Sequence, residues 1–134
     1  MELTGGCQCG AVRYAVSGEP RHVALCHCGD CRKSAGAPMV SWAAFGEDEF
    51  SVTQGNPVTF NSSGAAMRSF CGKCGSGLFY RNAEFLPGIV DIQSATLDEP
   101  QALPPGAHIQ VAERLHWMEA AHELPAFDRY PSQG

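Results

Sequence analysis

The sequence predicts a mainly β domain that has little helix and is built around bound metal. Short segments in which apolar and polar residues alternate recur along the chain, separated by glycine and proline turns, as is typical of antiparallel strands. The 134 residues are 44% hydrophobic and contain no linker or repeat, so we expect one domain over residues 1–134. Seven cysteines, an odd number, fall in three clusters. In a reducing compartment such clusters are more often metal ligands or catalytic groups than disulfides.

The first strands are expected to form a hairpin. In residues 10–20 the side chains of Val12, Tyr14 and Val16 alternate on one face, and the segment then breaks at Ser-Gly-Glu-Pro. Residues 21–26 offer a second short strand directly after this break. A turn between two adjacent strands predicts that they pair.

A short helix and further strands follow. Residues 30–38 are expected to form one or two helical turns, because Gly36 and Pro38 stop the segment. Further strands are expected at residues 39–45, 49–54, 57–62, 78–82 and 88–93. Residues 94–106 form a proline-rich loop that leads into the last part of the chain.

Charge and hydropathy exclude two classes of partner. The formal net charge is -5, from 9 Lys+Arg against 14 Asp+Glu, whereas nucleic-acid binding requires a basic face. The apolar runs are only a few residues long, so we expect no membrane span. The first ten residues lack the positive flank and the apolar stretch of a secretory signal. We therefore expect a cytoplasmic protein that binds neither nucleic acid nor membrane.

Two cysteine pairs are expected to form one closed zinc site. Cys7 and Cys9 are two residues apart, so in an extended segment both side chains project to the same side. Cys71 and Cys74 have the Cys-x-x-Cys spacing, with a glycine after each, which suits a tight turn around two thiolates. Four thiolates fill a tetrahedral site completely and mainly contribute folding free energy. We interpret this set as structural.

The remaining cysteines are Cys26, Cys28 and Cys31. Three protein ligands with an exchangeable fourth position are typical of a catalytic zinc site, so this triplet is the candidate active site. A thioredoxin-like redox pair of Cys28 and Cys31 fits less well, because that motif opens a helix in a βαβ unit. A ribbon-like site that joins Cys28 and Cys31 to the Cys-x-x-Cys pair would leave the first two cysteines without partners.

The triplet could instead form a second structural site with a histidine as its fourth ligand. The candidates are His22, His27, His108, His116 and His122. If Cys26 and Cys28 share an ion, however, the side chain of His27 points away from it.

The cysteine motifs and their neighbours resemble a known family. The residues that carry the resemblance are Gly6, Cys7, Cys9 and Gly10, then Cys26, His27, Cys28, Cys31 and Arg32, then Gly36, and then Phe70, Cys71, Cys74 and Gly75. A downstream pattern also matches, at residues 96–100, Pro105, His108, Ile109, Leu124 and Pro125. Together they are similar to the glutathione-dependent formaldehyde-activating enzyme family, which includes the centromere protein V type of domain. This resemblance implies a β-tent of small antiparallel sheets around zinc, with the division of cysteines given above.

The resemblance also implies an activity. Members of the family add the thiol of glutathione to formaldehyde and so form S-(hydroxymethyl)glutathione, a carbon-sulfur lyase type of reaction. Two zinc ions and glutathione as co-substrate are implied with it. A three-thiolate zinc site fits this chemistry in two ways: zinc could hold the incoming thiol as a thiolate, or it could polarise the aldehyde oxygen as a Lewis acid. Three anionic ligands weaken the Lewis acidity and leave the ion thiophilic, which favours the first role. The alternative is a non-catalytic, zinc-stabilised module that binds a protein or a thiol ligand.

Glutathione carries two carboxylates, so we expect cations near the triplet. Arg32 and Lys33 are close to it in sequence, and Arg68 could face the same cleft. Each of these side chains could equally pair with a surface acid. The aromatic residues Trp42, Phe45, Phe70, Phe79 and Tyr80 could form the wall of a pocket, although their alternating spacing is also typical of core residues.

Overall fold

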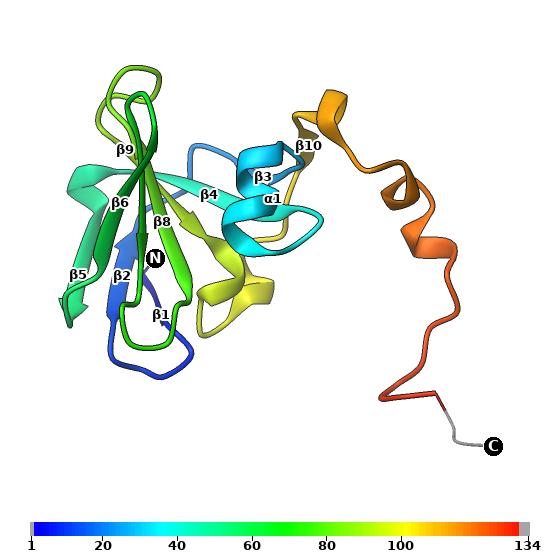
Figure 1. Cartoon of the computed structure of the whole chain (residues 1–134). Helices are drawn as coiled ribbons and strands as arrows, with labels where there is room; N and C mark the ends of the chain where they lie inside the picture. The colour runs from blue at the N-terminus through cyan, green and yellow to red at the C-terminus, as the bar shows by residue number, and fades with distance from the viewer. Residues whose placement is uncertain (1, 132–134) are drawn as a thin grey trace.

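A computed structural model describes residues 2–131 (Figure 1). The strands are β1 (Glu2–Gly6), β2 (Arg13–Ser17), β3 (Val23–Cys26), β4 (Val40–Gly46), β5 (Phe50–Gln54), β6 (Val58–Ser63), β7 (Ala66–Phe70), β8 (Gly77–Asn82), β9 (Ile89–Gln93) and β10 (Ala107–Ile109). The α-helix is α1 (Gly29–Ala35), and short 3₁₀ helices are η1 (Glu47–Glu49), η2 (Ser94–Thr96), η3 (Pro100–Ala102), η4 (Val111–Glu113), η5 (His116–Met118) and η6 (Ala121–Glu123). The predicted mainly β class with little helix is confirmed.

The strands form two sheets within residues 2–131. One has three strands in the order β1-β2-β5, and the other has seven in the order β10-β3-β4-β9-β8-β7-β6. Strands β10 and β3 are parallel, and the other pairs are antiparallel. Buried side chains of both sheets share one core, in which Tyr14 of β2 meets Phe79 of β8 edge to face with ring centroids 5.2 Å apart. Burial of these large aromatic side chains holds the two sheets together.

The predicted hairpin between residues 10–20 and 21–26 is wrong. These segments contain β2 and β3, which belong to different sheets. Strand β2 pairs instead with β1, through a turn in which the N–H of Gly10 donates to the carbonyl of Cys7 at 3.1 Å. Gly10 has a φ of 81°, a conformation that glycine adopts at no steric cost. This tighter turn, and the pairing of β2 with β5 on its other side, leave no free edge for β3.

Strand β1 is not evident from the sequence, because it is short and rich in glycine. Its register places Gly5 opposite Tyr14. A Cβ atom at position 5 would lie 2.5 Å from the tyrosine hydroxyl oxygen, so only glycine lets the ring lie over this strand. The hydroxyl of Tyr14 in turn lies 2.8 Å from that of Thr96, which ties η2 to the three-stranded sheet.

The helix and the five later strands predicted from the sequence are present. Helix α1 ends as expected, because Gly36 adopts a left-handed φ of 63° and its N–H donates to the carbonyl of Arg32 at 2.8 Å. Strand β7 is an addition to the predicted set. It pairs with β6 across a tight turn and adds Arg68 to the large sheet opposite Phe60.

After β10 the chain leaves the body of the molecule. Residues 114–131, which we call the arm, extend away from both sheets in a series of turns that include η5 and η6 (Figure 1). Among residues 2–131 no helix has the length and apolar character needed to span a membrane.

Candidate metal centres and the adjoining cavity

Four cysteines from two turns lie together. Cys7 and Cys9 follow β1, Cys71 and Cys74 follow β7, and their Sγ atoms all lie within 4.8 Å of one another. The Sγ of Cys9 is 3.6 Å from that of Cys7 and 3.8 Å from that of Cys71. Thiolates bound to zinc at about 2.3 Å in a tetrahedron have sulfur-sulfur distances of about 3.8 Å. The four-cysteine cluster could therefore hold one zinc ion with every ligand position filled by protein.

Backbone N–H groups and a serine point at these sulfurs. The N–H of Val12 donates to Cys7 Sγ at 3.2 Å, and the N–H of Cys74 donates to Cys71 Sγ at 3.4 Å. The hydroxyl of Ser76 lies 3.2 Å from Cys74 Sγ, and this hydrogen bond lowers the pKa of the Cys74 thiol to about 5. Hydrogen bonds to a sulfur favour its thiolate form, which is the form that binds metal.

The other three cysteines meet where β3 leads into α1. Cys26 ends the strand, Cys28 is the helix N-cap, and Cys31 lies in the helix, with all three Sγ atoms within 4.8 Å of one another. The Sγ atoms of Cys26 and Cys31 are 3.6 Å apart, again close to the spacing of thiolates on one zinc ion. Within residues 2–131 no other cysteine, histidine or acidic residue joins this three-cysteine cluster. Its tetrahedron lacks one protein ligand.

The three thiols do not ionise alike. The hydrogen bond between Cys26 and Cys31 lowers the pKa of Cys31 to about 5 and raises the pKa of Cys26. Burial raises the pKa of Cys28. The guanidinium of Arg68, whose Nη2 lies 3.9 Å from Cys31 Sγ, favours the Cys31 thiolate further. One thiolate therefore forms readily, and metal binding would displace the protons of the other two.

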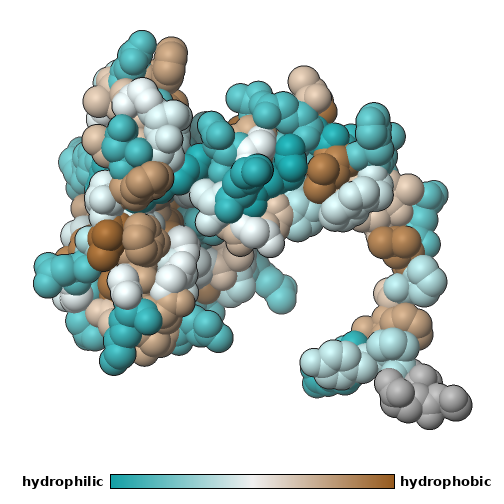
Figure 2. Space-filling view, viewed as in Figure 1, coloured by the Kyte–Doolittle hydropathy of each residue, from teal (hydrophilic) through white to brown (hydrophobic). Residues whose placement is uncertain are grey.

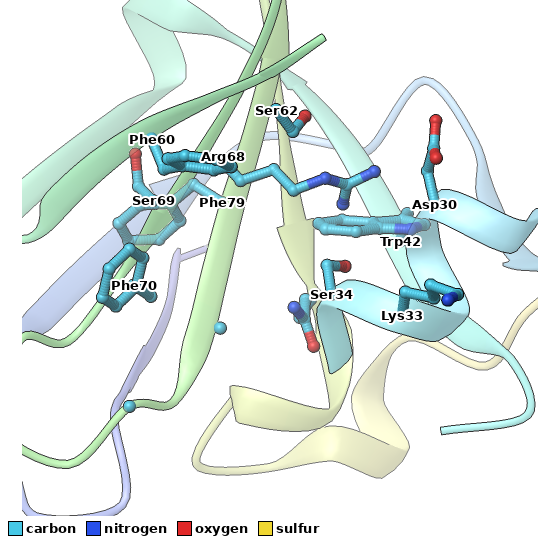
Figure 3. A pocket seen from close by; sticks show the side chains of 13 residues that line it. Asp30, Lys33, Ser34, Trp42, Phe60, Ser62, Arg68, Ser69, Phe70 and Phe79 are labelled. Carbon is cyan, nitrogen blue, oxygen red and sulfur yellow. The ribbon is translucent and has the colours of Figure 1, made fainter. Parts of the chain in front are cut away.

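A cavity of about 500 Å³ lies beside this cluster (Figure 3). The three cysteines are not among its lining residues, but the lining residues Arg68 and Trp42 both contact Cys31. Its aromatic lining consists of Trp42, Phe60, Phe70 and Phe79. Its polar and charged lining consists of Asp30, Lys33, Ser34, Ser62, Arg68, Ser69 and Gln93. Arg68 extends from β7 across the cavity toward Trp42, and its guanidinium also lies 4.9 Å from the ring centroid of Tyr80 (Figure 3). The cavity combines apolar walls with a few charged groups, as small-molecule sites commonly do.

The cations predicted near the triplet occupy different places. Lys33 and Arg68 line the cavity. Arg32 does not, because its Nε donates to the carbonyl of His27 at 3.4 Å on another side of α1. Of the five aromatic residues predicted as a wall, Trp42, Phe70 and Phe79 line the cavity. Phe45 is fully buried in the core instead, and Tyr80 is not among the lining residues.

Phe60 is the lining residue that sequence reasoning missed most clearly. It lies on β6, directly opposite Arg68 of β7. The signal for it is the pairing of these two strands, which can be recognised only once β7 is identified.

The histidine nearest to the triplet in sequence does not face it. His27 is buried, and its Nε2 lies 2.9 Å from Nδ1 of His108 on β10. This agrees with the expectation that the His27 side chain points away from an ion shared by Cys26 and Cys28. The imidazole pair links β10 to the segment after β3.

Asp91 is a buried acid close to the three-cysteine cluster. It lies on β9 opposite Tyr80 and Ala44, and its Oδ1 has no hydrogen-bond partner among residues 2–131. Burial raises the pKa of its carboxyl to about 6, and the negative charge of Cys31 adds to this rise, whereas His22 opposes it. Sequence reasoning did not single out this residue.

Comparisons with known proteins agree with the sequence motifs. The family model described as glutathione-dependent formaldehyde-activating enzyme matches residues 2–113. A protein of Halomonas elongata, provisionally named as a glutathione-dependent formaldehyde-activating enzyme, is 28% identical over 99% of this chain and 91% of its own length. An uncharacterized lyase of Schizosaccharomyces pombe is 29% identical over 59% of this chain and 57% of its own.

A solved structure has the same fold. It is the crystal structure of a Rhodobacter sphaeroides protein, which is 23% identical and superposes with a TM-score of 0.64 over 79% of this chain and 99% of that chain.

Proposed function

Because the chain belongs to the glutathione-dependent formaldehyde-activating enzyme family, we propose that it adds the thiol of glutathione, or of a related compound, to formaldehyde or a similar small electrophile. The product with formaldehyde is S-(hydroxymethyl)glutathione, and the reverse reaction is that of a carbon-sulfur lyase. The observation that carries the proposal is the incomplete three-cysteine cluster, which adjoins a cavity with cationic side chains.

In this proposal each cysteine cluster binds one zinc ion. Cys7, Cys9, Cys71 and Cys74 form the structural site, where four thiolates leave no room for a substrate. Cys26, Cys28 and Cys31 form the catalytic site. When bound there, zinc supplies a thiophilic centre that stabilises a thiolate at neutral pH.

The reaction is a balanced addition without oxidation or reduction. One carbon-sulfur bond forms, the π bond of the carbonyl breaks, and the proton of the thiol ends on the new hydroxyl oxygen. Negative charge develops on the aldehyde oxygen as sulfur attacks. The guanidinium of Arg68, close to Cys31, can stabilise this charge because it is fixed before the reaction by stacking on Tyr80.

The charged lining of the cavity suits the rest of the glutathione molecule. Lys33 can bind one of its carboxylates, and Asp30 can bind its ammonium group, while Arg68 remains beside Cys31. The aromatic side chains beside them can pack against its aliphatic parts. We do not place Arg32 in this site, because its guanidinium hydrogen-bonds to backbone outside the cavity.

The setting we propose is a single cytoplasmic domain. All seven cysteines are free, as a reducing compartment would keep them. The net charge of -5 favours a small-molecule substrate over nucleic acid.

The test is exchange spectroscopy by NMR on a mixture of ¹³C-formaldehyde and glutathione, because the adduct also forms without protein and only acceleration is informative. Zinc-loaded protein is expected to speed the exchange between free and thiol-bound carbon. The Cys28→Ala variant, compared at equal concentration and after its fold is verified by circular dichroism, is expected to leave the unaided rate unchanged.

Absence of acceleration by fully zinc-loaded protein, with other thiols and aldehydes also tried, would overturn the enzymatic proposal. The chain would then be a zinc-stabilised binding module. Thermal-shift screening with thiols would identify its ligand.

A further inference from the structure

The arm, residues 114–131, exposes large apolar side chains that the body of the chain does not cover. Trp117 is 62% exposed, Phe127 is 56% exposed and Tyr130 is 89% exposed. The backbone hydrogen bonds recorded for the arm are local turns, such as the one from the N–H of Met118 to the carbonyl of Leu115 at 2.9 Å. Large apolar side chains left in water forgo the favourable free energy that their burial would contribute. The arm therefore has a surface suited to a partner.

The body has an exposed apolar surface of its own, along its edge strand. Val58 and Phe60 of β6 are 45% and 60% exposed, and the strand is the last of its sheet among residues 2–131. We call Val58 and Phe60 the edge face. Figure 2 shows hydrophobic surface over this side of the body and again at intervals along the arm. Exposed edge strands with apolar side chains readily accept another chain.

The arm leaves the molecule far from its own edge face. It follows β10, which is one edge of the seven-stranded sheet, whereas β6 is the opposite edge. Six strand spacings of about 4.8 Å separate the two edges along the sheet. The arm also runs outward from the body (Figure 1). This geometry favours the edge face of another molecule over that of the same molecule.

The charges of the two surfaces are complementary. The arm carries the acids Glu119, Glu123 and Asp128, and it also carries Arg114 and Arg129 near its two ends, so its net charge is -1. The cavity that Phe60 lines carries the cations Lys33 and Arg68 against the single acid Asp30. The three acids between the ends of the arm would therefore meet a cavity lining in which cations outnumber acids.

We propose that two copies of this chain form a dimer by exchanging arms, each arm docking on the edge face of the other copy. The exchange is reciprocal, so the two copies form a closed two-fold assembly. In this assembly the arm and the edge face of each copy are covered by the other copy. Because Phe60 also lines the cavity, the arm of one copy lies at the mouth of the cavity of the other. The family model ends at residue 113, before the arm begins.

The test is analytical ultracentrifugation of the zinc-loaded full chain, which measures mass and needs no activity. Wild-type protein is expected to sediment with twice the mass of one chain. The arm variant, Trp117→Ser with Phe127→Ser, and the face variant, Phe60→Ser, are each expected to raise the dimer dissociation constant at least tenfold. The matched control is Phe85→Ser, which removes a side chain that is 75% exposed in the loop after β8, outside both surfaces. It is expected to leave the dimer unchanged.

Mixing the two variants distinguishes exchange from docking within one chain. A pair made of one arm variant and one face variant still contains one intact arm and one intact edge face. Mixed samples are therefore expected to associate more tightly than either variant alone.

The proposal would be overturned if the wild-type protein is a monomer, or if neither variant weakens the dimer. It would also be overturned if Phe85→Ser weakens the dimer as much as Phe60→Ser does, or if mixing restores no association. Equal melting temperatures and zinc contents of all variants ensure that a change in mass reflects the interface.

Discussion

The two cysteine clusters are alike in their sulfurs and opposite in their surroundings. The four-cysteine cluster lies between two turns near the surface, where Cys9 and Cys74 are exposed. The three-cysteine cluster is less accessible, since Cys26 and Cys31 are buried, yet it adjoins the cavity. Exposure of the cysteines therefore does not distinguish the cluster that we propose as catalytic. A complete ligand set leaves no position for a substrate even at the surface, whereas an incomplete set beside a cavity can accept a fourth ligand.

The charged groups near the two clusters differ in whether they have hydrogen-bond partners. Near the four-cysteine cluster, Asp98 is paired with Arg13 at 2.9 Å and accepts a hydrogen bond from Thr4 at 2.7 Å. Near the three-cysteine cluster, Asp91 is buried without a partner for its Oδ1 among residues 2–131, and Arg68 faces a thiolate. Satisfied pairs stabilise a fold, whereas unsatisfied groups are typical of sites that bind or react.

The largest expected effect is the loss of stability when one cysteine of the four-cysteine cluster is replaced. Cys74→Ala opens the four-cysteine site and is expected to lower the free energy of unfolding by more than about 4 kcal/mol, because metal binding at a structural site is part of the folding free energy. Chemical denaturation followed by circular dichroism measures this change. Cys28→Ala, the matched change in the other cluster, is expected to remain folded and lose activity. Equal destabilisation by the two variants would remove the distinction between the sites.

A smaller effect is expected at the cavity. Arg68→Ala removes the cation beside Cys31 and is expected to lower kcat/KM for glutathione roughly tenfold to a hundredfold, since a hydrogen bond to a charged group contributes about 1.5 to 3 kcal/mol. Steady-state exchange rates at several glutathione concentrations measure it. Arg81→Ala is the control, because Arg81 pairs with Glu47 outside the cavity. A similar loss of kcat/KM in both variants would show that any lost positive charge lowers the activity, whether or not it lies in the cavity.

The next effect concerns the buried acid on the reactive side. The pKa of Asp91 is raised from 3.8 to about 6 in the folded protein, so the folded state holds its proton more tightly than the unfolded state. Stability is therefore lost as the pH rises from about 4 to above 6. Asp91→Asn cannot ionise and is expected to raise Tm relative to wild type, more at pH 8 than at pH 5. A gain that is larger at pH 5 would contradict this sign.

The smallest effect is expected on the structural side, with the opposite sign. The hydrogen bonds from Arg13 and then Thr4 lower the pKa of Asp98 to about 2, so this carboxylate stabilises the fold above pH 3.8 and stops doing so as the pH falls through 2. Asp98→Asn is expected to lower Tm slightly at neutral pH, because the pair is exposed and screened by solvent. An increase in Tm, measured by calorimetry at low salt, would show that the pair does not stabilise this sheet.

The sequence predicts the clusters better than the sheets. Spacing within each motif is local, and the grouping expected for Cys7, Cys9, Cys71 and Cys74 is the one the structure has. Strand pairing is not local. The predicted hairpin of β2 with β3 is wrong because β1, a glycine-rich strand with few apolar residues, takes that place.

The cavity depends on the same non-local pairing. Arg68 and Phe60 meet because β6 and β7 form a hairpin, and they line the same cavity as Asp30, Lys33 and Ser34 of α1. Sequence reasoning identifies the cation but has no basis for placing the aromatic ring opposite it. Arg32 lies outside the cavity lining for a related reason, since neighbouring side chains on a helix surface point in different directions.

We propose that the three-cysteine cluster holds a labile zinc ion and that the four-cysteine cluster holds one that is part of the fold, and this division would account for the contrasts between the two clusters. The most direct measurement titrates a zinc chelator into the fully loaded protein while circular dichroism and released zinc are recorded together. We predict that the first equivalent of zinc leaves with the spectrum unchanged and that the second leaves only as the protein unfolds. In Cys28→Ala only the second step is expected. Release of both equivalents in one step together with unfolding would contradict this division.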